Sequence, residues 1–420
     1  MTRLGDELGG FALELATSLW SELGVDGTIR SHDWQAIDLE PLILFTAWIG
    51  ASDQRLRTRS IEWSIANFRL ASAIRMRNLA RHASRSTREA MGRFAATVNA
   101  HSNAPWPAEG KPIDLLPTMP VETPDLRRPS LLQLRLRALV GVSARAEILR
   151  LLLAEPDRPR PASQLAQGAA YGKGSVAQAL EMLTMAGIVQ MQPSGNRMLY
   201  QLSRPADVRL ALQSLPVGFP DWPPIFRITE SLVVYAQSAP PSASARLTTL
   251  RSLLHGINDD VERLGIMEVV PKANGVASLA DFEDWAKTFV ADQSGKTEMT
   301  PAAGDITYTV HHLSYGGWIG TMFARGRQPR QLESREPASS HGLADQPGPY
   351  DLAFRMFDDV LDQQRRKSRD MADAAALRTV SREFADELLR PIQGGQEATF
   401  TAEFMRRWFE NRRRRLKTSQ

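Results

Sequence analysis

The stretch "SARAEILRLLLAEPDRPRPASQLAQGAAYGKGSVAQALEMLTMAGIVQMQPSGNRMLYQLS", Ser143 to Ser203, has the most regular pattern of the chain. In its second half Val176, Leu180 and Leu183 recur at spacings of four and three, which places them on one face of a helix. Gly187 follows at the position where a left-handed residue ends a helix. The pattern therefore predicts a buried-face helix that stops at this glycine.

Two more helices and a hairpin are predicted around that helix. Ile148, Leu151 and Leu152 give an apolar face to a first helix, and Ser163 is placed to cap a second one. After Gly187, "IVQMQ" and "RMLYQLS" have the composition of short strands, and "PSGN" between them is turn chemistry. The predicted order is helix, helix, helix and hairpin.

This order resembles the winged helix-turn-helix domain of the MarR and ArsR groups of bacterial transcriptional regulators, over about 60 residues (143–203). The segments that match are "SQLAQGAAYGKGSVAQALEMLTMAGIV" and a hairpin that ends in Tyr-x-Leu. The resemblance implies that the third helix enters the major groove of DNA by its N-terminal end. Winged helices also serve as protein–protein modules, so both uses remain open.

The resemblance implies a set of DNA-contacting residues, namely Ser163, Tyr171, Lys173, Ser175, Gln178, Asn196 and Arg197. Gln178 suits adenine, and Lys173 suits guanine or a phosphate. The stretch carries only six basic residues against four acidic ones. Because neutralised phosphates supply much of the affinity for DNA, one such module should bind weakly. We therefore expect either a homodimer or additional phosphate-binding basic residues from other segments of the chain.

Two other segments contain basic residues that are candidates for such phosphate contacts. Arg77, Arg81, Arg85 and Arg88 follow at spacings of four, four and three, which predicts one basic stripe on a helix. This stripe either contacts phosphates or is a solvated surface. "RRPSLLQLRLR", Arg127 to Arg137, leads into the predicted module and adds Arg127 and Arg128 as candidate phosphate contacts or as part of a dimerising helix.

The rest of the chain is predicted to be mainly helical. The first half is expected to contain a helical domain at 8–100, a Pro-rich linker at 101–130 and the winged-helix domain at 131–205. A helical segment at 222–325 follows, with a β-hairpin near 305–323. A flexible loop at 326–349 and a helical segment at 350–417 complete the chain. The linker assignment rests on seven prolines between His101 and Ser130.

A second resemblance, to the homeodomain family, is contradicted by the residues that precede the matching stretch. "WFENRRRRL", Trp408 to Leu416, matches the W-F-x-N-R-R signature of homeodomains, but the helix that should precede it would contain Pro391, Gly394 and Gly395. Proline costs about 3 kcal/mol inside a helix and glycine about 1 kcal/mol. The stretch is better interpreted as an amphipathic helix that docks by its aromatic side.

Composition and motifs exclude several classes. The 420 residues contain no cysteine, so disulfides, thiolate metal sites and cysteine nucleophiles are excluded. No apolar run approaches the roughly 18 residues of a membrane helix, and the N-terminus lacks a secretory pattern, so we expect a cytoplasmic protein without membrane contact. The histidines show no metal-ligand spacing and no catalytic motif is present, so we expect no enzyme, no metal and no cofactor.

Two hypotheses follow. The first is a bacterial DNA-binding transcriptional regulator that acts as a homodimer on double-stranded DNA. The second is a protein-interaction component, such as an antitoxin or the regulatory subunit of a defence complex, whose module or arginine-rich helices contact a partner protein. Salt-dependent binding to a DNA duplex separates the two hypotheses.

Overall fold

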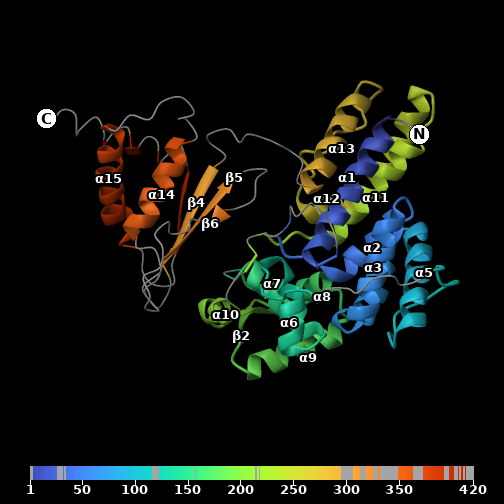
Figure 1. Cartoon of the computed structure of the whole chain (residues 1–420), viewed down its shortest axis with the longest axis horizontal. Coiled ribbons are helices and arrows are strands. Elements are labelled where there is room, and N and C mark those ends of the chain that lie inside the picture. The colour runs from blue at the N-terminus through green and yellow to red at the C-terminus, as the bar shows by residue number, and fades with distance from the viewer. Residues whose placement is uncertain are drawn as a thin grey trace. The chain divides into compact units, whose positions relative to one another are not determined.

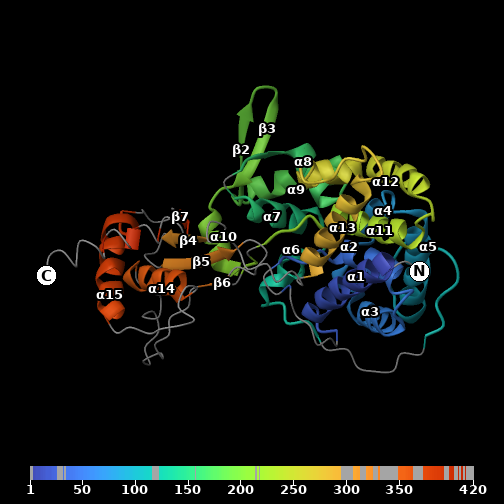
Figure 2. The same cartoon turned by 90° about the horizontal axis from the view of Figure 1, so that it is seen from above.

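The chain is mainly helical and divides into two compact units, Met1–Thr297 and Glu298–Gln420 (Figures 1 and 2). In this computed structural model the described residues are 3–25, 32, 35–115, 123–156, 158–212, 215–216, 218–294, 306–312, 318–324, 330–331, 349–362, 372–391, 397–401, 405, 408–409 and 412. The segment 222–325, expected as one piece, is divided between the two units.

Eight helices of the first unit share one large apolar core. They are α1 (Arg3–Glu22), α2 (Leu39–Ile49), α3 (Gln54–Asn67), α4 (Ala73–Ala80), α5 (Arg85–His101), α11 (Trp222–Gln237), α12 (Ala243–Leu264) and α13 (Ser278–Ser294). Helix α1 packs against α2, α11 and α13. Helix α2 is buried over nearly its whole length, because its sequence is apolar on every side.

The first unit also contains a central block with an apolar core of its own. Its elements are a 3-10 turn at Pro129–Leu131, α6 (Leu132–Val140), α7 (Ala144–Ala154), β1 (Arg160–Pro161), α8 (Ala162–Ala169), α9 (Lys173–Met185), β2 (Val189–Ser194), β3 (Arg197–Leu202) and α10 (Pro205–Leu212). The strands form an antiparallel sheet in the order β1-β3-β2. The β2–β3 hairpin extends away from the helices of the block (Figure 2).

The helical periodicity in this block predicted burial correctly. Val176, Leu180 and Leu183 of α9 are all buried, and Gly187 has a φ of +71° just after the helix. The predicted cap of α8 is wrong. The residue before the helix is Pro161, which makes no capping hydrogen bond, and Ser163 is an exposed residue inside the first turn.

The described part of the Pro-rich segment before residue 116 is packed against the helices rather than extended as a free linker. Its described part has little regular structure, as the prolines require. Trp106 is buried in the core of the first unit, and its carbonyl accepts a hydrogen bond from Asn99 of α5 at 3.0 Å. The amide of Ile113 donates to Thr97 of the same helix at 2.8 Å. These contacts fix the segment along α5.

The second unit is a four-stranded antiparallel sheet packed with helices. The strands β4 (Ile306–His312), β5 (Trp318–Ala324), β6 (Arg330–Gln331) and β7 (Glu397–Thr401) have the order β6-β5-β4-β7. Helices α14 (Pro349–Asp362) and α15 (Ala372–Phe384), with a π-helical turn at Ala385–Leu389, complete a common core.

Two expectations for this unit need correction. The hairpin predicted near 305–323 is present as β4 and β5, but the segment 350–417 is not purely helical, because β7 pairs with β4. Most of the loop expected at 326–349 lies outside the described residues, and its Arg330–Gln331 forms β6.

The aromatic residues near the C-terminus dock inside this unit. Met405 and Phe409 are buried, and the ring of Trp408 meets that of Phe384 edge-to-face at 5.5 Å. Arg412 stacks over Trp408 at 4.6 Å and pairs with Glu387 at 2.7 Å. This agrees with the docking interpretation of the stretch, while Asn411 lies outside the described residues.

Candidate nucleic-acid interface

The N-terminal half of α9 is an open surface. Lys173, Ser175 and Gln178 are all exposed and lie on the first two turns of the helix. A Cβ added at Gly172 or Gly174 would meet no atom within 4 Å, so nothing in the described part of the chain covers this end. The free amides of a helix N-terminus favour negatively charged groups.

The hairpin tip provides two further exposed candidates, in addition to the exposed Ser163 of α8. Asn196 and Arg197 lie at the two-residue turn between β2 and β3 and are exposed. Gly195 in this turn has a φ of +58°, a conformation that glycine adopts without strain. The turn thus presents an amide and a guanidinium to solvent beyond the helices of the block (Figure 2).

Tyr171 does not belong to this exposed set. Its side chain is 8% exposed, and its hydroxyl forms a 2.7 Å hydrogen bond with the hydroxyl of Ser72, just before α4. Burial raises the pKa of this phenol, which therefore stays protonated. A side chain enclosed within the protein cannot reach a base or a phosphate, so the expected DNA contact by Tyr171 is wrong.

Helix α4 holds the turn that precedes α9. Arg75 donates to the carbonyl of Ala169 at 2.9 Å, and Asn78 donates to the carbonyl of Ala170 at 2.9 Å. Ala170 has a φ of +55°, a left-handed conformation that costs a non-glycine residue about 1–2 kcal/mol. The contacts from α4 therefore fix a strained turn directly before the candidate DNA-binding helix.

Helix α4 and the residue after it carry two exposed arginines. Arg77 and Arg81 are exposed, and among the described residues neither has an acidic partner. Asn78, beside Arg77, bonds Ala170, which is three residues before Lys173. We call Arg77 and Arg81 the basic pair. It adds two unneutralised charges to the neighbourhood of the α9 N-terminus.

The expected four-arginine stripe is broken after this pair. Helix α4 ends at Ala80, and Ser84 caps a separate helix, α5. Arg85 pairs with Glu89 at 2.7 Å, and Arg88 donates to the carbonyl of Ala83 at 3.0 Å. The residues of the stripe therefore lie on two helices, and the charge of Arg85 is already balanced.

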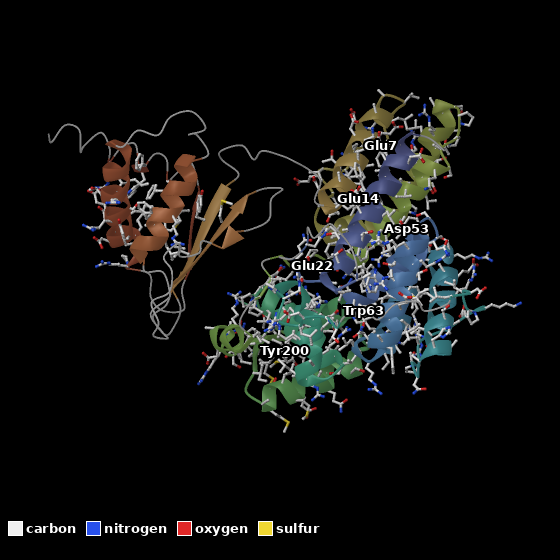
Figure 3. All side chains as sticks on the ribbon, in the orientation of Figure 1. Glu7, Glu14, Glu22, Asp53, Trp63 and Tyr200 are labelled. Atoms are coloured by element: carbon white, nitrogen blue, oxygen red, sulfur yellow. The ribbon has the colours of Figure 1, made fainter. Side chains whose placement is uncertain are left out.

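The arginines of the lead segment are also engaged within the protein. Arg127 pairs with Asp125 at 2.8 Å, and Arg128 donates through Nε to Glu22 at 3.0 Å. Glu22, labelled in Figure 3, lies at the end of α1 next to the central block. Each of these arginines is thus paired with a carboxylate of the protein, and their contact with phosphates stays a prediction.

A buried cluster of charges joins the central block to α2 and α4. We call it the ion cluster, and its members are Asp38 and Glu40 at the start of α2, Arg75 of α4, Arg137 of α6, and Glu147 and Arg150 of α7. Three guanidinium groups thus face three carboxylates, so the cluster has no net charge.

The hydrogen bonds of the ion cluster cross between the block and the N-terminal helices. Arg137 donates to Glu40 and to Glu147, each at 2.6 Å. Arg75 donates to Asp38 at 2.6 Å and to Glu40 at 2.5 Å. The amide of Gln133 bridges Asp38 at 3.0 Å and Glu147 at 3.1 Å.

These contacts favour the ionised forms of Asp38 and Glu147. Burial alone raises the pKa of Asp38, but attraction to Arg75 and Arg150 outweighs it and lowers the pKa below its usual value. The pKa of Glu147 also lies well below its usual value: burial raises it, and the attraction of three arginines prevails. Buried charges persist only when paired and hydrogen-bonded, as here.

Sequence inspection missed this cluster because its members are far apart in the chain. The available signal was a polar residue on an apolar helix face, since Gln133 and Arg137 fall four apart among the leucines of α6. Such a pair on an inward face indicates a buried partner, though not its identity.

One feature of the block is unlike a DNA-binding surface. Met182 and Met185 of α9 are 48% and 75% exposed, and Met191 and Met198 of the hairpin are 55% and 39% exposed. Ser175, Gln178, Met182 and Met185 follow at spacings of three, four and three. The outer face of α9 is therefore polar at its N-terminal half and apolar at its C-terminal half.

Neither a metal site, nor a membrane-spanning helix, nor a known relative points to a function for the described part of the chain. Within the described ranges no group of three or more His, Asp or Glu side chains is placed to hold a metal ion. No described helix is long and apolar enough to cross a membrane. Comparisons with protein-family models, curated proteins and solved structures found no match.

Proposed function

We propose that this protein binds double-stranded DNA as a transcriptional regulator, with residues 143–203 acting as a winged helix-turn-helix. The observation that carries the proposal is the exposed N-terminal half of α9, with Lys173, Ser175 and Gln178 on an uncovered surface. In this class of domain such a helix end lies in the major groove. Gln178 is suited to a bidentate contact with adenine.

The basic pair supports this proposal by adding charge where the block itself has little. Lys173 and Arg197 alone make few phosphate contacts. Arg77 lies on the helix that bonds the turn before α9 and Arg81 follows its end, which supports a role for both in neutralising phosphates that flank the reading helix. Phosphate contacts of this kind position the protein and do not specify sequence.

The modest charge also favours two copies on one site. Two modules double the number of phosphate contacts, and a two-fold arrangement places two half-sites about 34–36 Å apart. We therefore propose a homodimer on a pseudo-palindromic operator. Light scattering on the full chain with and without a selected duplex measures this directly, and a one-to-one complex on an asymmetric site contradicts it.

The functional proposal is tested by selecting duplexes from a random pool with the full-length chain. We expect an enriched motif, and we expect Gln178→Ala to lose preference at one base position, worth about 1–3 kcal/mol. Gln167→Ala is the matched control, because Gln167 is an exposed glutamine of the neighbouring helix α8. If the wild-type chain enriches no motif, sequence-specific DNA binding is refuted.

A second candidate function is supported by the four exposed methionines. Methionine is common on surfaces that bind protein helices, because its flexible side chain adapts to different partners. An antitoxin or a regulatory subunit would use this apolar half of α9. Met185→Lys separates the candidates: it leaves duplex binding intact or strengthens it if DNA is the partner, and it disrupts a protein complex formed through this face.

A further inference from the structure

The first unit contains a pocket between α2, the α4–α5 turn and α11. Its walls are largely apolar, with Leu44 and Phe45 from α2, Leu79 from α4, Pro223 and Phe226 from α11, and one acidic residue, Glu230. The rings of Phe45 and Phe226 are stacked with their centres 4.5 Å apart. The internal volume of the pocket is about 30 Å3 and its mouth is open, which limits a ligand to a small organic molecule that lies partly in solvent.

Glu230 is the chemically distinct residue of this pocket. The residue is 7% exposed, and its Oε1 accepts hydrogen bonds from Ser84 Oγ at 2.5 Å and from Thr87 Oγ1 at 2.7 Å. Ser84 caps α5, so the helix N-terminus also favours the negative charge. These contacts hold the carboxylate in one orientation.

The second oxygen of Glu230 is left for another partner. No described residue donates a hydrogen bond to Oε2 of Glu230. This oxygen is not fully enclosed by the protein, so solvent reaches it. Arg227, the cation that also lines the pocket, is bound to Asp260 with Nε at 2.9 Å. Glu230 therefore has no cationic partner in the described part of the chain.

We infer that this pocket binds a small organic cation. Its ammonium group donates to Oε2 of Glu230, and its apolar body lies against Phe45 and Phe226. A charged donor suits this position because a hydrogen bond between two ionised groups is about twice as strong as a neutral one. The apolar walls select against inorganic cations, which need several oxygen ligands.

The pocket is connected to the turn before α9 through two elements. Leu79 lines the pocket and follows Asn78, which bonds Ala170. Pro41 also lines the pocket and follows Glu40, a member of the ion cluster. A ligand that shifts α4 or the start of α2 therefore alters the presentation of α9. This coupling rests on the proposed DNA-binding function, whereas the ligand site does not.

The ligand site is tested by calorimetric titration of the full-length chain with phenethylammonium chloride. We expect binding, and we expect the neutral analogue 2-phenylethanol and the variant Glu230→Gln each to weaken it by about tenfold or more. Glu262→Gln is the control, because it removes an exposed charge of α12 outside the pocket.

A second variant guards against misfolding. Ala83→Leu fills the pocket and keeps Glu230, and thermal melts confirm that both variants fold. It should abolish binding of the probe. No binding by the wild-type chain at millimolar probe, or equal binding of the neutral analogue, overturns the site.

The coupling is tested with a duplex selected by the same chain. We expect saturating probe to change duplex affinity by about 5- to 150-fold, the usual range of coupling between two sites. An unchanged affinity overturns the coupling and leaves the ligand site standing. If the chain binds no duplex at all, the proposed function and the coupling fail together, and the calorimetric result still decides the ligand site.

Discussion

Replacing Glu147 by glutamine should strongly destabilise the first unit. Glu147 is fully buried and accepts hydrogen bonds from Arg137 at 2.6 Å and from Arg150 at 3.1 Å. Glutamine has nearly the same shape but no charge, and its amide group places two donors among arginines that are donors themselves. The variant therefore leaves an uncompensated positive charge inside the protein.

The magnitude follows from this burial. Removing one partner of a buried, hydrogen-bonded ion pair costs about 3–5 kcal/mol. The matched control is Glu89→Gln, since Glu89 pairs with Arg85 through side chains that are 63% and 87% exposed. An exposed pair on a helix contributes at most about 1 kcal/mol, so the control should lose little.

Urea denaturation of both full-length variants, followed by circular dichroism and by tryptophan fluorescence, measures the two losses. Seven of the nine tryptophans belong to the first unit, where Trp20, Trp63 and Trp222 are buried, so fluorescence reports mainly on that unit. If Glu147→Gln loses less than about 1 kcal/mol, as the control should, the ion cluster does not hold the block to α2 and α4 as reasoned.

Three further outcomes are expected. The pKa values of Asp38 and Glu147 lie below their ordinary values of 3.8 and 4.5, so both groups stabilise the fold fully above about pH 5, and this stabilisation decreases as the pH falls through 4 and below. Urea midpoints measured between pH 7 and pH 3 should show this loss, and the loss should be smaller in Glu147→Gln. Ala170→Gly should raise the free energy of unfolding by about 1 kcal/mol, since glycine accepts a φ of +55° without strain, and a decrease contradicts the assigned turn. Tyr171→Phe should lower the free energy of unfolding by about 1 kcal/mol and leave duplex affinity unchanged; a tenfold loss of affinity at an unchanged melting temperature would return Tyr171 to the interface.

Local patterns predicted local features of the fold. The spacing of Val176, Leu180 and Leu183 identified the buried face of α9, because helix periodicity depends only on neighbouring residues. The exposure of Gln178 followed from the same pattern, since it occupies the opposite face, whereas Lys173 is exposed because it is the first residue of the helix.

Long-range features escaped prediction. Arg75 and Arg137 looked like surface charges, and only the packing of α4 and α6 against α2 brings them to Glu40. Tyr171 seemed exposed because its partner Ser72 is 99 residues away in the sequence. The arginine spacing suggested one stripe, but the cap at Ser84 starts a new helix. The proximity of α4 to the turn before α9 could be recognised only from the bond between Asn78 and Ala170 in the folded chain.

The central claim, that α9 and the basic pair form a DNA-binding surface, is tested most directly by the salt dependence of duplex binding. Fluorescence anisotropy between about 50 and 200 mM salt gives the log–log slope for the full-length chain. Arg77→Ala/Arg81→Ala should reduce the slope by about 1.8, since each lost phosphate contact removes about 0.9. Arg85→Ala/Arg127→Ala removes two arginines already paired with Glu89 and Asp125 and should leave the slope unchanged. A wild-type chain without salt-dependent duplex binding, or an equal slope in all three proteins, would contradict the account.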